Sequence, residues 1–249
     1  MLRWIKAIIP SWALPFAKRV YDLAKHFLYS HSALLSQAGQ DYWVYGEAFN
    51  EKRGGFFVDI GAFDGVHVSN TFILEKRYGW RGICIEANPG VFPRLRRNRD
   101  CTCVQVCLDS NVGTVEFALQ EELGGIANLL NPTIAPPSAG QVVQLTTRPL
   151  INVLREQGAP PVIDYLSIDV EGAEERILAD FDFNAYRFNT LTIERPTERL
   201  RGILQQAGYR CVKEIPRLDC FYVHQQFVET YLSHLYQFHR KRHFRLRWA

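Results

Sequence analysis

Alternation of short apolar runs with helical segments is the feature that most restricts the fold of this chain. Apolar runs at residues 56–60, 82–86, 102–108, 162–169 and 188–194 have the length and composition of buried strands. Segments with helical spacing separate most of them. Because strands joined by helices pair in parallel, the pattern predicts an α/β fold with a doubly wound sheet and helices on both faces.

The end of the pattern departs from this alternation. Residues 209–213 and 218–224 read as two strands around Pro216 with no helix between them, which predicts one antiparallel strand in an otherwise parallel sheet. A short extra strand is expected at residues 114–119. Residues 124–140 read as a loop, which we expect to form part of the wall of a substrate site. The predicted helices span residues 69–78, 91–98, 149–157 (capped near Thr146 or Thr147), 173–178 and 198–206.

A glycine-containing turn follows the first strand and precedes the first of these helices. Glycines at such a turn let the backbone bend sharply and approach a ligand. The GxGxxG fingerprint of dinucleotide sites is absent, and acids that would repel a pyrophosphate are present. Acids suit a ligand with ammonium and sulfonium charges, which favours S-adenosylmethionine over NAD. The candidate cofactor residues here are Asp59, Gly61, Ala62, Asp64 and Gly65.

Acidic residues also end three later strands. Glu86 closes the second strand, where an acid of doubly wound folds accepts hydrogen bonds from ribose hydroxyls. Asp169 and Glu171 follow the fourth strand, at the edge of the sheet where ligands bind, and Glu194 closes the fifth. Glu174 stands in the first turn of the next helix, where an acid favours the helix dipole, so capping is its simpler interpretation.

Three strings of the chain resemble the FkbM family of methyltransferases. They are GGFFVDIGAFDGVHVSNT, GWRGICIEANP and IDYLSIDVEGAEERIL, and the resemblance extends over about residues 36–223. It implies a Rossmann-like class I methyltransferase with a mostly parallel seven-stranded sheet, one antiparallel strand and helices on both faces. It also implies S-adenosylmethionine as the cofactor and a hydroxyl of a sugar, glycan or related natural product as the acceptor.

The resemblance assigns roles to individual residues. Asp59, Gly61 and Gly65 match the family's cofactor loop, and Glu86 matches its ribose-binding acid. Asp169, Glu171 and Gly172 match its motif after the fourth strand, so Asp169 is also expected to contact the cofactor. An acid near the adenine often follows the third strand of family members. Asp109 or Ser110 would take that place here.

Transfer to a hydroxyl needs a base within hydrogen-bond reach, or a metal ion that lowers the pKa of the hydroxyl. Asp169 or Glu171 is the expected base, and His67, beside the cofactor loop, competes with them. The carboxylates of Asp169, Glu171 and Glu194 can also form an oxygen-rich site for a divalent cation such as magnesium.

Charge is distributed unevenly along the chain and suggests three regions. Residues 1–35 read as a basic, aromatic, helical extension, residues 36–228 as the methyltransferase domain, and residues 229–249 as a basic helical tail. Basic ends suit peripheral contact with anionic lipid, and a glycolipid acceptor would fit with that contact. The six cysteines show no CxxC pairing, so we expect reduced thiols in a cytoplasmic protein, peripheral at the inner membrane face.

Two other functions compete with transfer to a saccharide. An RNA methyltransferase would use the basic tail with Phe244 and Trp248 to bind phosphates and bases. The body between the ends is acidic, however, and the motif after the fourth strand is Asp-Val-Glu-Gly rather than the Asn/Asp-Pro-Pro-Tyr type, so nucleic acid is disfavoured. The third function is a non-catalytic Rossmann-like binding protein that retains the cofactor pocket.

Overall fold

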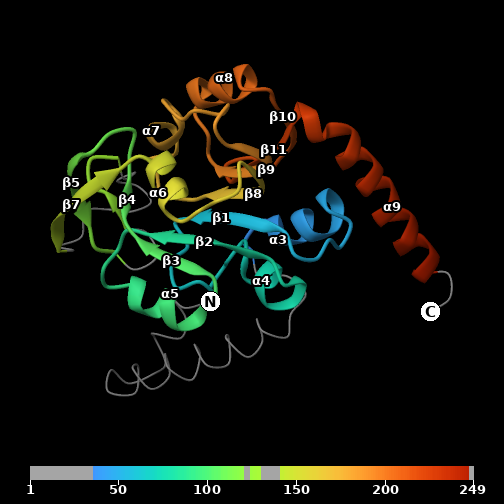
Figure 1. Cartoon of the computed structure of the whole chain (residues 1–249), viewed down its shortest axis with the longest axis horizontal. Helices are drawn as coiled ribbons and strands as arrows, with labels where there is room; N and C mark the ends of the chain where they lie inside the picture. The colour runs from blue at the N-terminus through green and yellow to red at the C-terminus, as the bar shows by residue number, and fades with distance from the viewer. Residues whose placement is uncertain (1–35, 121–123, 130–140, 247–249) are drawn as a thin grey trace, which may run out of the picture.

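The computed structural model describes residues 36–120, 124–129 and 141–246. Its centre is a seven-stranded sheet in the order β10-β11-β9-β8-β1-β2-β3 (Figure 1). Strand β11 is antiparallel to both of its neighbours, and the other adjacent pairs are parallel. The predicted fold class is therefore confirmed. The strands are β1 (Phe56–Ile60), β2 (Arg81–Glu86), β3 (Thr102–Gln105), β8 (Val162–Ile168), β9 (Arg187–Glu194), β10 (Tyr209–Glu214) and β11 (Asp219–His224).

Helices cover both faces of this sheet, as expected of a doubly wound fold. One face carries α6 (Leu150–Glu156), α7 (Glu174–Leu178) and α8 (Glu198–Gln206), whose apolar residues share one core cluster. The opposite face carries α3 (Gln40–Tyr42), the π-helix η1 (Trp43–Ala48), α4 (Phe72–Tyr78), α5 (Phe92–Asn98) and the start of α9 (Val228–Leu246).

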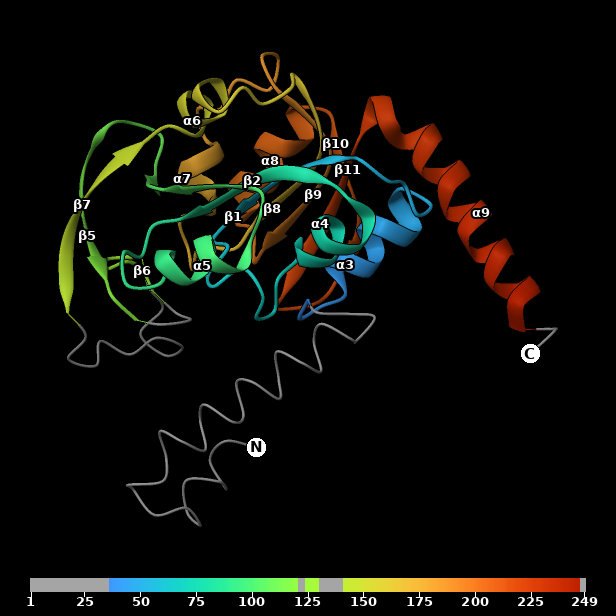
Figure 2. The ribbon, with the colours of Figure 1, turned by 60° about the horizontal axis from the view of Figure 1, so that its bottom comes forward.

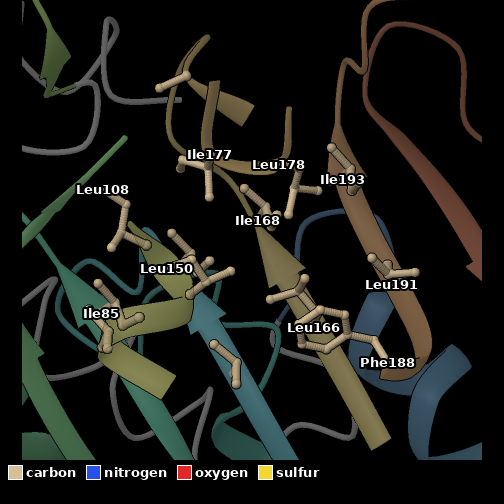
Figure 3. Close-up of a cluster of buried hydrophobic side chains, with 14 of the residues drawn as sticks. Ile85, Leu108, Leu150, Leu166, Ile168, Ile177, Leu178, Phe188, Leu191 and Ile193 are labelled. Carbon is tan, nitrogen blue, oxygen red and sulfur yellow. The ribbon is translucent and has the colours of Figure 1, made fainter. Parts of the chain in front are cut away.

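Strand residues supply the two cores in alternation because successive side chains point to opposite faces of a sheet. Val58 and Ile60 pack into the cluster under α6, α7 and α8, and Phe57 between them packs into the other cluster. Figure 3 shows the first cluster, in which Ile168 of β8 lies beside Leu178 of α7, and Leu166 lies beside Phe188 of β9. Burial on both sides explains why these strands read as continuous apolar runs.

A second, four-stranded sheet is absent from the sequence prediction. It contains β4 (Cys107–Leu108), β7 (Val142–Arg148), β5 (Gly113–Ala118) and β6 (Gly125–Ile126), in that order. The single strand predicted at residues 102–108 is therefore wrong, because the chain leaves β2 after Val106 and pairs with β7 from Cys107.

Two neighbouring predictions need correction as well. Residues 142–148 form a strand rather than the approach to a helix, and α6 is preceded by Pro149 as its N-cap, not by Thr146 or Thr147. The segment predicted as a loop contains β6, and residues 130–140 of it lie outside the described residues. Figure 2 shows this second sheet at one end of the molecule and α9 at the other.

The first half of α9 belongs to the second core. Tyr231 and Phe238 are buried, and the Phe238 ring packs so closely on Gly46 of η1 that a Cβ there would lie 2.5 Å from its Cζ. Beyond this contact the helix extends away from the body (Figure 1). The basic extension predicted for residues 1–35 lies outside the described residues. Among the helices that the structure describes, none is long and apolar enough to cross a membrane.

Candidate active site

A cavity of about 600 Å³ opens where the parallel strands end. Its wall contains residues that follow β1, β2, β8 and β9, and the second sheet contributes Phe117 and Ile126. The volume is in the range of cofactor sites, and the place is where open α/β sheets bind ligands.

The turn after β1 forms the floor of the cavity. Gly61 and Ala62 donate backbone hydrogen bonds to the Ile85 carbonyl (3.0 and 3.1 Å), and the Asp169 amide donates to Ile60 (3.0 Å). Gly61 has a φ of 80°, and a Cβ on it would lie 1.7 Å from the Asp169 carbonyl oxygen. Only glycine satisfies both the left-handed backbone and this close approach, as the sequence predicted for a ligand-binding turn.

Glu86 lines the cavity at the end of β2, with both carboxylate oxygens held by backbone. The Phe63 amide donates to Oε2 (2.9 Å), and the Asn88 amide donates to Oε1 (2.7 Å). Burial raises the pKa of Glu86 to about 7, although the two amides oppose that shift. The carboxylate is thus fixed in orientation, and its remaining lone pairs are available to a pair of ligand hydroxyls.

Asp59 also lines the cavity, at the end of β1, and is connected to a buried arginine. Thr71 Oγ1 donates to its carboxylate (2.6 Å), and Arg99 Nη2 donates to the same Thr71 oxygen (3.0 Å). Burial raises the pKa of Asp59, and the positive charge of Arg99 opposes the rise. Arg99 also pairs with Glu75 (2.5 Å), so a neutralised network supports the cofactor loop from below.

Three carboxylates meet where β8 and β9 end. One carboxylate oxygen each of Asp169, Glu171 and Glu194 lies within 4.8 Å of the other two. Removal from water and the two neighbouring glutamates hold the pKa of Asp169 well above its usual range. Arg195 forms ion pairs with Glu171 (2.9 Å) and Glu194 (2.7 Å). The sequence predicted that these acids converge, but not that an arginine lies among them.

The family model of the methyltransferase FkbM domain matches residues 59–211 of the chain. This range includes the cofactor turn and all of the strand-end acids described above. The chain belongs to the FkbM methyltransferase family. Membership confirms the resemblance seen in the sequence and makes the chain an S-adenosylmethionine-dependent methyltransferase.

Solved methyltransferase structures resemble this FkbM methyltransferase at low identity. The FkbM methyltransferase of Methylobacillus flagellatus KT is 16% identical, with a TM-score of 0.45 over 74% of this chain and 50% of that one. The METTL16 methyltransferase domain is 12% identical, with a TM-score of 0.44 over 76% and 67%. The TehB-like S-adenosylmethionine-dependent methyltransferase of Corynebacterium glutamicum ATCC 13032 Kitasato is 10% identical, with a TM-score of 0.42 over 87% and 100%. The chain spans half the length of the Methylobacillus protein, and no curated protein matches it.

Some of the predicted cofactor residues of this FkbM methyltransferase lie away from the cavity lining. The Asp64 carboxylate accepts hydrogen bonds from the amides of Val66 (2.9 Å) and His67 (2.8 Å), and so shapes the turn. Gly65 has a φ of 78° and packs against Leu95 and Arg99, where a Cβ would lie 2.7 and 2.6 Å from their side chains. Both residues therefore support the turn from behind.

The two candidates for the adenine side are also absent from the lining. Asp109 is buried and forms an ion pair with Arg176 instead, and Ser110 donates its amide to the Asp109 carboxylate (2.8 Å). Cys107 and Leu108 of β4 occupy the cavity wall at this point. The prediction failed because the chain passes from one sheet to the other between β3 and β4, which the sequence did not reveal.

His67 and Glu194 line the cavity, as Asp169 and Glu171 do. The predicted catalytic and metal-binding candidates therefore all line one cavity. The His67 ring lies edge to face with that of Phe63, at 6.3 Å between centroids. The carboxyl groups of Asp169 and Glu171 are the other candidate bases, and these three assignments stay predictions.

Strained backbone conformations are concentrated among the residues that line the cavity, which the sequence did not predict. Among the described non-glycine residues, seven have a positive φ, and five of these line the cavity. Val68 is β-branched and so disfavours its φ of 45° especially strongly. Such conformations persist only where surrounding contacts fix them, and they gather at ligand sites. The five are Phe63, Val68, Glu171, Arg195 and Arg217.

Proposed function

We propose that this FkbM methyltransferase transfers the methyl group of S-adenosylmethionine to a hydroxyl of a saccharide, glycan or related natural product. The observation that carries the proposal is the position of Asp169, which lines the cavity and whose backbone carbonyl oxygen lies against Gly61 of the cofactor turn. A hydroxyl is a weak nucleophile while protonated, and a carboxylate beside the methyl donor supplies the base that it needs.

The cavity residues fit S-adenosylmethionine by their chemistry. Glu86 has a fixed carboxylate for the ribose hydroxyls, and Gly61 and Ala62 allow the ligand to approach the backbone. Asp59 and Asp169 supply negative charge beside the turn, which suits an ammonium and a sulfonium group. When bound, the cofactor supplies an electrophilic methyl group.

Asp169 is our choice for the base. Removal from water and the neighbouring glutamates raise its pKa above that of an ordinary aspartate, which makes it a stronger proton acceptor. Glu171 already forms an ion pair with Arg195, which makes it a poorer proton acceptor. In the reaction a C–O bond forms, the S–CH₃ bond breaks, and the hydroxyl proton moves to the carboxylate. S-Adenosylhomocysteine and a methyl ether are the products, and His67 is the alternative base.

A saccharide acceptor is supported by the polar part of the cavity. Gln37 and Asn70 line it together with Arg217, which offers donors at the rim. These groups can hydrogen-bond to several hydroxyls of one sugar. Contact of the basic ends with a membrane, which would present a glycolipid acceptor, stays a prediction because residues 1–35 lie outside the described part of the chain.

The test uses S-adenosylmethionine labelled in its methyl group, with sugar nucleotides and extracted glycans as acceptors. We expect a labelled product that is stable to alkali, because a methyl ether survives conditions that release methanol from a methyl ester. Asp169→Asn should still bind S-adenosylhomocysteine measurably and lose about 10²–10⁴-fold in turnover, which is the usual contribution of a general base. Asp180→Asn, an exposed carboxyl change in the same chain, is the matched control.

Other outcomes contradict the proposal. Unchanged turnover of Asp169→Asn would remove this residue from the mechanism, and label in RNA would favour the nucleic-acid alternative. Cofactor binding without any labelled product would favour a binding protein. The geometry disfavours RNA: β11 runs from Asp219 beside Glu194 to Val223 beside Thr190, so the basic helix α9 leaves the sheet at the edge opposite the cavity.

A further inference from the structure

The three carboxylates at the ends of β8 and β9 lie close enough to repel one another when they are ionised. Asp169, Glu171 and Glu194 each place an oxygen within 4.8 Å of the others, in the arrangement that hard divalent cations prefer. Like charges at such distances oppose one another strongly in a site partly removed from water. A cation among them relieves this repulsion, and it can be a metal ion or a basic side chain.

An arginine nitrogen already lies between two of the carboxylates. Nη2 of Arg195 is 2.9 Å from Glu171 Oε2 and 2.7 Å from Glu194 Oε1. A single nitrogen thus bridges two carboxylates, as a bound metal ion would. Binding a divalent ion to the same oxygens would bring it against the guanidinium, and like-charge repulsion disfavours that state.

The backbone of Arg195 is fixed so that the side chain reaches this position. Its φ is 41°, which is rare for a residue with a side chain, and its amide donates a 2.7 Å hydrogen bond to the Leu218 carbonyl. Glu194 is paired in register with Asp219 of β11, so the two strands hold both ends of the ion pair. Arg195 itself lines the cavity.

The Glu194 carboxylate has one oxygen atom that lies outside this ion pair. Its Oε1 faces Arg195, and its Oε2 is buried and receives no hydrogen bond from any residue that the structure describes. Buried carboxylate oxygens ordinarily have a partner. The neighbouring carboxyl of Asp169, when it carries a proton, can donate to this oxygen, which ties the proton on Asp169 to the position of Glu194.

We propose that Arg195 is the resident cation of this acidic cluster and takes the place of a divalent metal ion. It is a positioning residue: its ion pairs hold the carboxylates of Glu171 and Glu194 in place beside Asp169. The effect on turnover rests on the proposed function, whereas the exclusion of a metal ion by the guanidinium does not.

Manganese titration followed by electron paramagnetic resonance tests the exclusion without any acceptor. We expect no Mn²⁺ site in the parent chain and one in Arg195→Gln, where three carboxylates lose their cation. The double variant Arg195→Gln with Glu194→Gln should lose that site again, and Arg195→Lys should behave like the parent. Arg199→Gln removes another arginine from an ion pair, with Glu175 outside the cavity, and is the control that should bind no ion.

Two results would overturn the inference. The first is a Mn²⁺ site in the parent chain that Glu171→Gln abolishes. The second is an Arg195→Gln chain that binds S-adenosylhomocysteine and unfolds like the parent but binds no Mn²⁺. If Arg195→Gln does not fold, Arg195→Lys and the parent still decide the question by their response to the metal.

Turnover gives a separate readout once an acceptor is in hand. The parent rate should be insensitive to EDTA, and Arg195→Gln should lose at least tenfold in kcat with a shifted pH profile that Arg195→Lys largely restores. A parent rate that falls with EDTA and returns with Mg²⁺ contradicts the inference and leaves the proposed hydroxyl transfer intact. A parent chain without any methyl transfer contradicts the proposed function, and the Mn²⁺ result still stands.

Discussion

A single carboxyl group, that of Glu86, links cofactor affinity to pH. Burial disfavours its ionised form and raises its pKa in the folded chain to about 7, above that of an ordinary glutamate. The raised pKa stabilises the cofactor-free fold at pH values below the pKa that Glu86 has in the unfolded chain. That contribution is lost as the pH rises through about 7. Cofactor binding follows the opposite trend, since ribose hydroxyls need the carboxylate as an acceptor.

We therefore expect the affinity for S-adenosylhomocysteine to rise about tenfold between about pH 6 and about pH 8, as one group ionises. Isothermal titration calorimetry across that interval measures the effect. Glu86→Gln should bind more weakly and lose this pH dependence. An unchanged pH profile in Glu86→Gln would mean that another group controls binding.

Gly61 and Gly79 allow steric and backbone effects to be separated. Both have a positive φ, of 80° and 66°, but a Cβ on Gly61 would collide with the Asp169 carbonyl, whereas a Cβ on Gly79 meets nothing within 4 Å. Gly79→Ala should cost only the left-handed penalty of about 1 kcal/mol. Gly61→Ala should cost more than this and abolish cofactor binding. Urea unfolding of the two variants checks the difference, and equal losses would contradict it.

Single residues of the site were partly accessible from sequence. Gly61, Glu86 and Asp169 stand at strand ends, and the end of a parallel strand fixes which edge of the sheet a residue occupies. The partner of a carboxylate is set by tertiary packing instead. Nothing in the spacing of Asp109 or Glu171 indicated that Arg176 and Arg195 would pair with them.

At the scale of elements, buried Arg99 joins α4, α5 and the cofactor loop. It pairs with Glu75 (2.5 Å) and donates to the Gly65 carbonyl (3.2 Å) and to Thr71 Oγ1 (3.0 Å). Its side chain is fully buried, so removal of the guanidinium leaves Glu75 Oε2 without its buried ion-pair partner, while Lys76 stays beside Oε1 (3.1 Å). Arg99→Met should therefore lower the free energy of unfolding by about 3–5 kcal/mol.

Urea unfolding measures this loss, and a double-mutant cycle with Glu75→Gln isolates the pair. The double variant should be more stable than the sum of the single losses predicts, because it no longer contains an unpaired charge. Arg96→Met on the exposed side of α5 is the control and should change stability by no more than about 0.5 kcal/mol. Additive losses would show that the two side chains act independently.

The parallel strands were predictable as elements because burial on both faces makes them continuous apolar runs. Strand β7 was not, because its exposed and half-buried positions alternate and include Gln144 and Thr146, which read as the approach to a helix. The break at Val106 was hidden for another reason: β3 and β4 are consecutive in sequence and separate only through their different partners, β2 and β7.

At the scale of the whole molecule, two truncations can separate the part of α9 that packs on the body from the part beyond it. Truncation after Phe227 removes Tyr231 from the second core and the buried Phe238 ring from Gly46, and should lower the midpoint of thermal unfolding by several degrees or prevent folding. Truncation after Lys241 leaves both rings in place and should leave the midpoint nearly unchanged. Circular dichroism on heating compares the two, and equal effects would contradict the division.

The parallel direction of most strands and the antiparallel strand of the closing pair followed from the alternation of strands and helices and from its end. The addition of a second sheet did not, since short strands with mixed burial carry little signal. The region predicted as a tail at residues 229–249 also shows this limit, because packing of Phe238 on Gly46 depends on residues far apart in the chain.

The passage from β3 into β4 gives the second sheet and the cofactor wall one stretch of backbone in common. Val106 bonds to β2, Cys107 and Leu108 pair with β7, and all three line the cavity. Thermodynamic linkage between two binding events is reciprocal. An acceptor that tightens the second sheet would thereby retain the methyl donor more firmly by the factor with which the donor retains the acceptor. Departure of the methylated product would then loosen the spent nucleoside, which gives turnover a preferred order of release.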